Sequence, residues 1–152
     1  MGQFVRFISK EDVIISGDVV FCYIDGKSHL MKAQNGKTNF GYDQGMIMRK
    51  KMIEEFDGFD MSYKILSDYD LLVRMVNQGV PLQIIDTKPI AYFSQGGTTS
   101  NMRTFIVTIK EKYAIYKKYH IVKYPFLLTC KYAYYKMRSI VYRTFRKEIG
   151  LK

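Results

Sequence analysis

The spacing of apolar residues changes along the chain, and each change predicts a different element. Residues 12–24 are rich in β-branched and aromatic side chains, and Asp25-Gly26 follows them as a strong turn signal. We predict one or two strands there, ending in a hairpin-like turn. Residues 30–43 show little periodicity and carry Asn-Gly, Thr and Gly positions, so they predict a loop.

The pattern changes again at Gly45. Residues 46–48 are all apolar, which predicts a short buried strand or the entry to a helix. Residues 49–56 then predict a short helix, and Asp57-Gly58 is a typical stop signal after it.

Residues 67–79 give the sharpest local signal in the chain. Ser67 is a good N-cap residue, and Asp68 and Asp70 fall in the first turn, where the helix dipole favours negative charge. Gly79 is a typical C-terminal stop. We therefore predict an amphipathic helix, with one apolar stripe made of Leu71, Leu72, Met75 and Val76.

Two further strands are predicted after this helix. Residues 82–86 and 90–93 are apolar runs on either side of an Asp-Thr-Lys-Pro turn, and residues 94–100 predict a flexible loop. Strands and helices thus alternate up to about residue 100, which predicts an α/β fold.

The last third of the chain has a different composition. From Asn101 there is no Gly until Gly150, and Pro125 is the only breaker, so two helices that meet near residues 123–125 are expected. In the second helix, apolar residues recur at helical spacing and basic residues occupy the remaining surface, as in a basic amphipathic helix. We therefore divide the chain into a domain over 1–102 and a helical tail over 103–152.

Charge separates these two parts more clearly than the total of +10 does. Residues 1–102 hold 11 Lys and Arg against 12 Asp and Glu, whereas residues 103–152 hold 13 against 2 and also 8 of the 13 Tyr. A cationic, aromatic tail favours an anionic partner, either a phospholipid surface or nucleic acid. Lipid is favoured, because no nucleic-acid-binding motif accompanies the charge. A solvated helical face with no partner is the alternative.

Composition excludes several classes of protein. Cys22 and Cys130 lie far apart and no His or second Cys stands at metal-ligand spacing, which argues against zinc fingers, disulfide scaffolds and CxxC redox chemistry. No apolar run approaches the length of a membrane span, and the N-terminal residues lack the layout of a signal peptide.

Asp68 and Asp70 are the strongest candidates for chemistry. Their spacing is formally an Asp-x-Asp, which elsewhere holds a divalent cation, but such a pair is expected at the end of a strand and these residues open a helix. A carboxylate at a helix N-terminus that faces a cleft is well placed as a general base. The alternative is that the two acids only stabilise the helix start.

The order and spacing of several blocks resemble the later half of family 2 glycosyltransferases of the GT-A fold. The resemblance covers about residues 12–102 and implies a partial, Rossmann-like GT-A domain, followed here by the pair of basic amphipathic helices. The blocks are Ser16-Gly17-Asp18, Gln44-Gly45-Met46-Ile47-Met48-Arg49-Lys50, residues 56–74, Ile90-Ala91-Tyr92-Phe93 and Gly96-Gly97-Thr98-Thr99-Ser100.

The resemblance implies transfer of a sugar, with inversion, from a nucleotide-sugar donor to a glycan or lipid-linked acceptor. Asp68 matches the family's general base, which deprotonates the acceptor hydroxyl. Asp70 would be a supporting acid, and Gln44 with Gly45 would line the donor or acceptor cleft. Processive members carry a Gln-x-x-Arg-Trp motif, and this chain contains no Trp, so non-processive transfer is expected.

The chain also departs from the family. The first half of a GT-A domain supplies the nucleotide-binding strands and the strand-end Asp-x-Asp for Mn²⁺ or Mg²⁺, and nothing before Asp18 matches either. We therefore expect a divalent cation whose ligands are mostly absent from this chain, a missing N-terminal half, and no activity of the chain alone. An exposed sheet edge is expected where the missing strands would pair.

Two hypotheses follow. The first is a fragment or subunit of an inverting glycosyltransferase in bacterial polysaccharide assembly, cytoplasmic and peripheral to the inner face of the membrane. The second is a non-catalytic basic module that binds anionic membrane or nucleic acid through residues 103–152.

Overall fold

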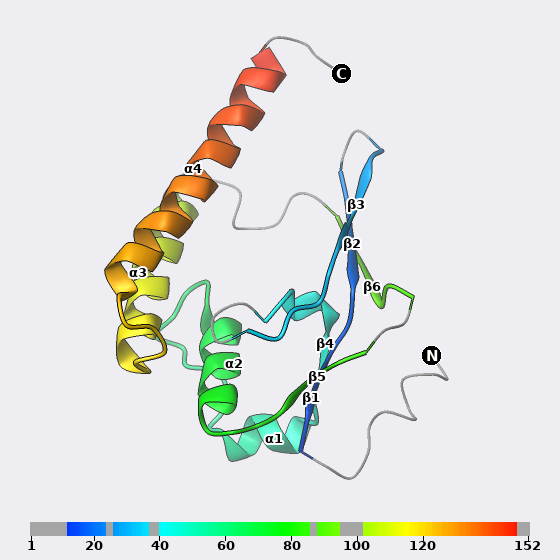
Figure 1. The fold of residues 1–152 in the computed structure, drawn as a ribbon, viewed down its shortest axis with the longest axis vertical. Helices are drawn as coiled ribbons and strands as arrows, with labels where there is room; N and C mark the ends of the chain where they lie inside the picture. The colour runs from blue at the N-terminus through cyan, green and yellow to red at the C-terminus, as the bar shows by residue number, and fades with distance from the viewer. Residues whose placement is uncertain (1–11, 24–25, 37–39, 86–87, 95–101, 149–152) are drawn as a thin grey trace. The chain divides into compact units, whose positions relative to one another are not determined.

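The computed structural model describes residues 12–23, 26–36, 40–85, 88–94 and 102–148, with side chains from 104 described as far as 138 (Figure 1). Over these residues the chain is a mixed α/β protein with two three-stranded sheets and four α-helices. It divides into two compact units, Met1–Gly97 and Thr98–Lys152. The expected loop at 94–100 lies outside the described residues, apart from Ser94, which ends a strand.

The first sheet has the order β4-β1-β5 and lies in the N-terminal unit. Its members are β1 (Ile14–Ser16), β4 (Met46–Ile47) and β5 (Leu82–Ile84). Strand β4 runs antiparallel to β1, and β5 runs parallel to it. The strand alternatives predicted for residues 14–16, 46–47 and 82–84 are therefore confirmed.

The second sheet has the order β3-β2-β6 and is formed by β2 (Val19–Cys22), β3 (Ser28–Met31) and β6 (Ala91–Ser94). Strand β3 pairs antiparallel with β2, and the Tyr23 N–H donates to the Lys27 carbonyl at 2.8 Å just beyond the paired residues. Strand β6 pairs parallel with β2. The prediction of a loop from residue 30 is wrong at residues 30–31, which belong to β3. This strand is mostly exposed, so its backbone pairing with β2 leaves little hydrophobic pattern in the sequence.

The parallel pairing continues from one sheet to the other. The Ile85 N–H donates to the Ser16 carbonyl at 2.9 Å, and the Ile90 N–H donates to the Asp18 carbonyl at 2.9 Å. The residues that follow β5 and precede β6 are therefore bonded to the residues that join β1 to β2. Residues 82–84 and 91–94 are thus not partners of each other, and each pairs with an earlier strand.

Two helices complete the described N-terminal unit, α1 (Lys50–Glu55) and α2 (Ser67–Asn77). The predicted cap of α2 is wrong: Leu66 is the N-cap, no side chain caps it, and Ser67 is already helical. The predicted stop is confirmed, because Gly79 has φ 92° and its N–H donates to Val76 at 3.0 Å, while the Val80 N–H donates to Met75 at 3.0 Å. This pair of bonds is a Schellman motif.

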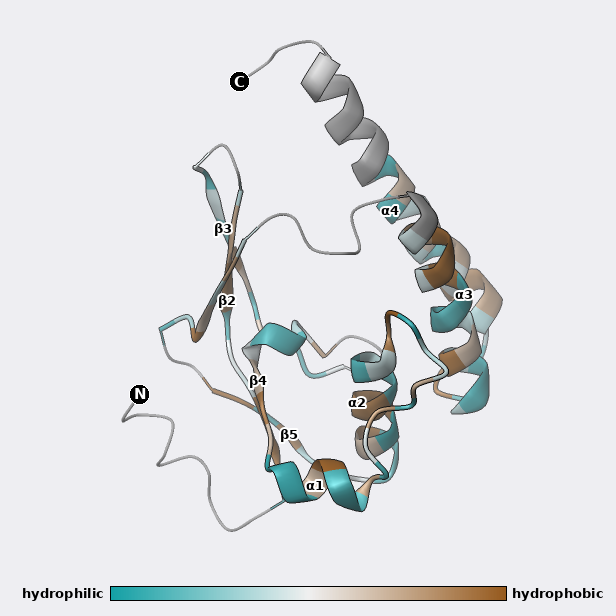
Figure 2. Ribbon diagram, turned by 180° about the vertical axis from the view of Figure 1, so that it is seen from behind, coloured by the Kyte–Doolittle hydropathy of each residue, from teal (hydrophilic) through white to brown (hydrophobic). Residues whose placement is uncertain are grey.

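The core of the N-terminal unit lies between the first sheet and α2. Figure 2 shows hydrophobic positions on β4, β5 and α2, and the buried side chains agree with it. Helix α2 buries the middle of its length, residues 70–73 and Met75, whereas residues 67–69 are half-buried and Asn77 at its end is exposed. The buried apolar side chains there include Ile14, Ile15, Val19, Met52, Leu71, Leu72, Val73, Met75 and Leu82.

The C-terminal unit contains the two predicted helices, α3 (Met102–Lys118) and α4 (Pro125–Glu148). Pro125 opens α4, where the lack of an N–H costs no hydrogen bond. Neither helix, nor any shorter one in the described ranges, combines the length and hydrophobicity that a bilayer-spanning helix requires.

Candidate active site

An open pocket of about 370 Å³ lies between β4, α1, the following loop and the start of α2. Its wall is mainly apolar, and two aspartates are among the residues that line it. Such a combination of apolar surface and few polar groups is typical of small-molecule sites. The lining residues are Asp43, Met46, Ile47, Met48, Ile53, Phe59, Asp68, Leu71 and Leu72.

Asp68 lines this pocket from the first turn of α2. Its Oδ1 accepts a hydrogen bond of 2.7 Å from the N–H of Tyr69, a backbone donor at the positive end of the helix dipole. The side chain is half-buried. The structure therefore holds the Asp68 carboxyl at a helix start that opens on a pocket, the arrangement in which a general base was expected.

Asp43 is the second acid of the pocket and comes from the 3₁₀ helix η2 (Asp43–Gly45). Its carboxyl lies within hydrogen-bonding reach of the Asp68 carboxyl. Partial desolvation, this hydrogen bond and the repulsion between two negative charges raise the pKa of Asp43 to about 6. Two backbone N–H groups of η2, its own and that of Gln44, oppose the shift only in part.

This pair of carboxyl groups can hold a proton or accept one, depending on its state of ionisation. In the singly protonated state, the Asp43 O–H donates to the Asp68 carboxylate. In the doubly ionised state, Asp68 is next to a like charge and is ready to accept a proton from a hydroxyl group placed between the pocket walls.

Asp70 has a different environment from Asp68. Its side chain is fully buried, and its Oδ2 accepts a hydrogen bond of 3.3 Å from the Arg74 guanidinium one turn later on α2. Asp70 does not line the pocket. Its side chain contacts Arg74 inside the protein, which suits a role in orienting the start of α2.

Arg74 connects α2 to the loop that carries a wall of the pocket. Besides Asp70, its guanidinium donates to the carbonyl oxygens of Phe56 and Gly58, the latter at 2.8 Å. This loop turns through Asp57 at φ 58° and Gly58 at φ 67° and then reaches Phe59, which lines the pocket and is 48% exposed. Arg74 thus fixes the loop that presents Phe59.

Gln44 and Gly45 are brought next to Asp43 by η2, but neither lines the pocket. Gln44 is exposed, whereas Gly45 is buried against the β1–β2 connection. Its carbonyl accepts a 2.9 Å hydrogen bond from Gly17, and a Cβ at Gly45 would lie 2.6 Å from the Gly17 carbonyl oxygen. Gly45 is therefore required for close backbone packing, which places η2 and Asp43.

The carboxyl pair offers two of the oxygen-bearing groups that a hard divalent cation prefers. Across the described parts of the chain, no three or more His, Cys, Asp or Glu side chains gather where they could hold a metal ion. Asp43 and Asp68 alone would supply only part of the six or more oxygen ligands that such a cation takes, the rest of which waters or substrate phosphates provide in many Mg²⁺ sites.

Sequence reasoning identified Asp68 but missed Asp43 and Phe59 as pocket residues. The only hint in the sequence was that Asp43, at the end of the predicted loop, adjoins the Gln44-Gly45 block and Phe59 adjoins the Asp57-Gly58 stop.

The chain matches no family model, no curated protein and no solved structure.

Proposed function

We propose that this chain forms the acceptor side of an inverting glycosyltransferase of the family 2 type, with Asp68 as general base. The observation that carries the proposal is the Asp43–Asp68 carboxyl pair on the wall of a largely apolar pocket. The resemblance of residues 12–102 to that family adds the reaction class. A base is needed here because an uncharged hydroxyl group is a weak nucleophile at neutral pH.

The proposed step is a single displacement. The Asp68 carboxylate takes the proton of the acceptor hydroxyl as its oxygen forms a bond to the anomeric carbon of the donor sugar. The bond from that carbon to the nucleotide diphosphate breaks, and the diphosphate leaves with the electron pair. The configuration at the anomeric carbon is inverted, and the proton remains on Asp68 or passes to Asp43, its hydrogen-bonded neighbour.

The apolar wall of the pocket fits one face of an acceptor sugar. Pyranose rings have apolar C–H faces and polar edges, and aromatic side chains bury such faces well. Phe59 is exposed at the pocket, and Met46 and Met48 contribute flexible apolar surface. A sugar that lies on this wall would direct a hydroxyl group at its edge toward Asp68.

The donor is assigned to another part of the assembly. In the described residues β4 pairs only with β1, so its second edge carries no strand and can receive one from a nucleotide-binding segment. We propose that the nucleotide-sugar and its divalent cation bind to that segment, next to the open edge of β4. The chain alone is then expected to bind acceptor without transferring sugar.

NMR of methionine methyl groups tests the acceptor assignment on the chain as it exists. Millimolar methyl glycosides are expected to shift the signals of Met46 and Met48 and to leave that of Met61 unchanged, because Met61 is 86% exposed and outside the pocket. Uridine diphosphate (UDP) is expected to shift neither pocket signal. Equal shifts at all three residues, or shifts produced by UDP alone, would contradict the acceptor assignment.

A further inference from the structure

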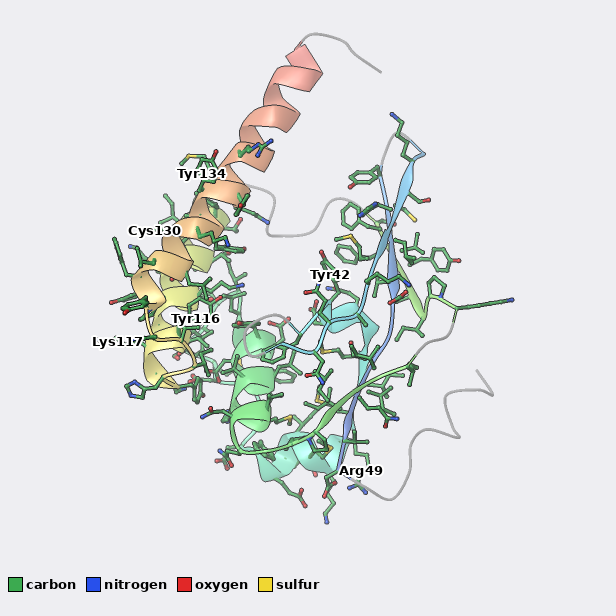
Figure 3. All side chains as sticks on the ribbon, in the orientation of Figure 1. Tyr42, Arg49, Tyr116, Lys117, Cys130 and Tyr134 are labelled. Carbon is green, nitrogen blue, oxygen red and sulfur yellow. The ribbon has the colours of Figure 1, made fainter. Side chains whose placement is uncertain are left out.

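The outward face of α4 carries a continuous apolar and aromatic stripe. At about 100° per residue, its members fall within roughly a third of the helix circumference. All are exposed, Phe126 to 67%. Cys130 and Tyr134, one turn apart, are labelled in Figure 3. We name this the outer stripe of α4; it consists of Phe126, Leu127, Cys130, Tyr134 and Met137.

Contacts with α3 fix which face of α4 points outward. The Lys112 ammonium of α3 lies 4.3 Å from the centre of the Tyr132 ring of α4. Burial, followed by repulsion from Lys136, lowers the pKa of Lys112 to about 8. Tyr132 and Lys136 thus lie on the α3 side together with the buried Thr129, and the outer stripe lies on the opposite side.

Basic residues border the outer stripe. Lys131 and Arg138 are exposed and follow stripe residues on the same flank of the helix, one next to Cys130 and the other next to Met137. The whole segment 103–152 has 13 basic and 2 acidic residues. An apolar stripe with a cationic border is the pattern of a helix that lies in the interface of an anionic bilayer.

We propose that α4 docks on an anionic phospholipid surface through its outer stripe, with Lys131 and Arg138 at the lipid phosphates. The exposed Phe126, Leu127 and Met137 decide between the two anionic partners. On a nucleic-acid backbone these side chains would stay in water, whereas at a bilayer they enter the acyl boundary. Figure 2 shows hydrophobic and hydrophilic positions side by side along α3 and the described part of α4.

Vesicle binding by the full chain tests the proposal independently of any transferase activity. The chain is expected to sediment with mixed phosphatidylcholine–phosphatidylglycerol vesicles, not with phosphatidylcholine alone, and less at high salt. The double variant Lys131→Glu/Arg138→Glu is expected to bind at least about tenfold more weakly. Lys50→Glu/Lys51→Glu, the same charge change on exposed residues of α1, is the matched control and should bind nearly as wild type.

A tryptophan reporter tests insertion of the stripe. The chain has no Trp, so Phe126→Trp provides a single signal, which should shift to shorter wavelength on anionic vesicles. Tyr92→Trp, at a position 75% exposed on β6, should show no such shift. The proposal is overturned if the two reporters respond alike, if both charge variants bind equally, or if the chain binds duplex DNA but not vesicles.

Discussion

The carboxyl groups of Asp43 and Asp68 lie within hydrogen-bonding reach of each other at the pocket that both residues line. The two side chains come from different elements, η2 and α2, and the close packing of Gly45 against Gly17 helps to set η2 in place. Repulsion between two like charges this close favours a state in which one of the two groups keeps its proton. Together with desolvation, the largest cause, this repulsion raises the pKa of Asp43 to about 6.

The carboxyl pair should show this in its titration. Carbon-13 NMR of the aspartate carboxyl groups is expected to show one group titrating near pH 6, as the raised pKa of Asp43 indicates. In Asp68→Asn the pKa of Asp43 should fall but stay above its ordinary value, because desolvation, its largest cause, remains. An unchanged pKa in that variant would show that the two groups do not interact.

The same shift predicts how stability depends on pH. The folded chain holds the Asp43 proton more tightly than the unfolded chain, so this contribution is present below about pH 4 and is lost as pH rises through about 6. Asp43→Asn should therefore raise the free energy of unfolding at pH 8, by less than about 1 kcal/mol since solvent screens this exposed group. Urea unfolding should show little difference between the wild type and Asp43→Asn at pH 4. An equal gain in unfolding free energy at pH 4 and pH 8 would argue against a cost from ionising Asp43.

Arg74 is expected to be important for stability because it is the cation beside the fully buried Asp70 carboxylate. Arg74→Met should lower the free energy of unfolding by about 3–5 kcal/mol. Lys51→Met is the matched control, because Lys51 also pairs with an acid one turn later, Glu55 at 3.1 Å, but on the surface. It should cost less than about 1 kcal/mol. Urea unfolding measures both variants. Similar losses of unfolding free energy would contradict the importance of Arg74 as the partner of the buried Asp70.

Gly45→Ala is expected to be destabilising by about 1–3 kcal/mol, because the new Cβ would lie 2.6 Å from both the Gly17 carbonyl oxygen and the Val19 Cγ2. Gly17→Ala is the comparison. Its Cβ would meet the Ile90 Cδ1 at 2.9 Å, and that side chain can change rotamer. Thermal unfolding should therefore rank Gly45→Ala as the less stable variant, and the reverse order would argue against backbone crowding at η2.

Much of the fold could be predicted from local sequence signals. Helix α2 has a clear apolar stripe and a Gly79 stop, and α3 and α4 are separated by Pro125, so their existence follows from periodicity and breakers. Strand β3 escaped prediction because it is held by backbone pairing with β2 and its side chains are mostly exposed. The cap of α2 was misplaced by one residue since propensity favoured Ser67 over Leu66.

The candidate site was predictable only in part. Asp68 stood out because an acid at a helix start has a recognisable pattern. Asp43 is distant in sequence and lies in an aperiodic segment, so its meeting with Asp68 depends on tertiary packing. Asp70 is an acid of the same helix start, yet it lies two residues after Asp68 and is fully buried, whereas Asp68 lines the pocket.

The most direct test of Asp68 as general base is sugar transfer by the whole assembly that contains this chain, isolated from its own cells. Nucleotide-sugars would be the donors and a lipid extract of the same cells the acceptor. We predict that Asp68→Asn lowers kcat by about 10²–10⁴-fold with the fold intact, while Asp57→Asn, at an exposed acid outside the pocket, retains activity. Transfer undiminished in Asp68→Asn, or no transfer by the wild type with any donor, would contradict it.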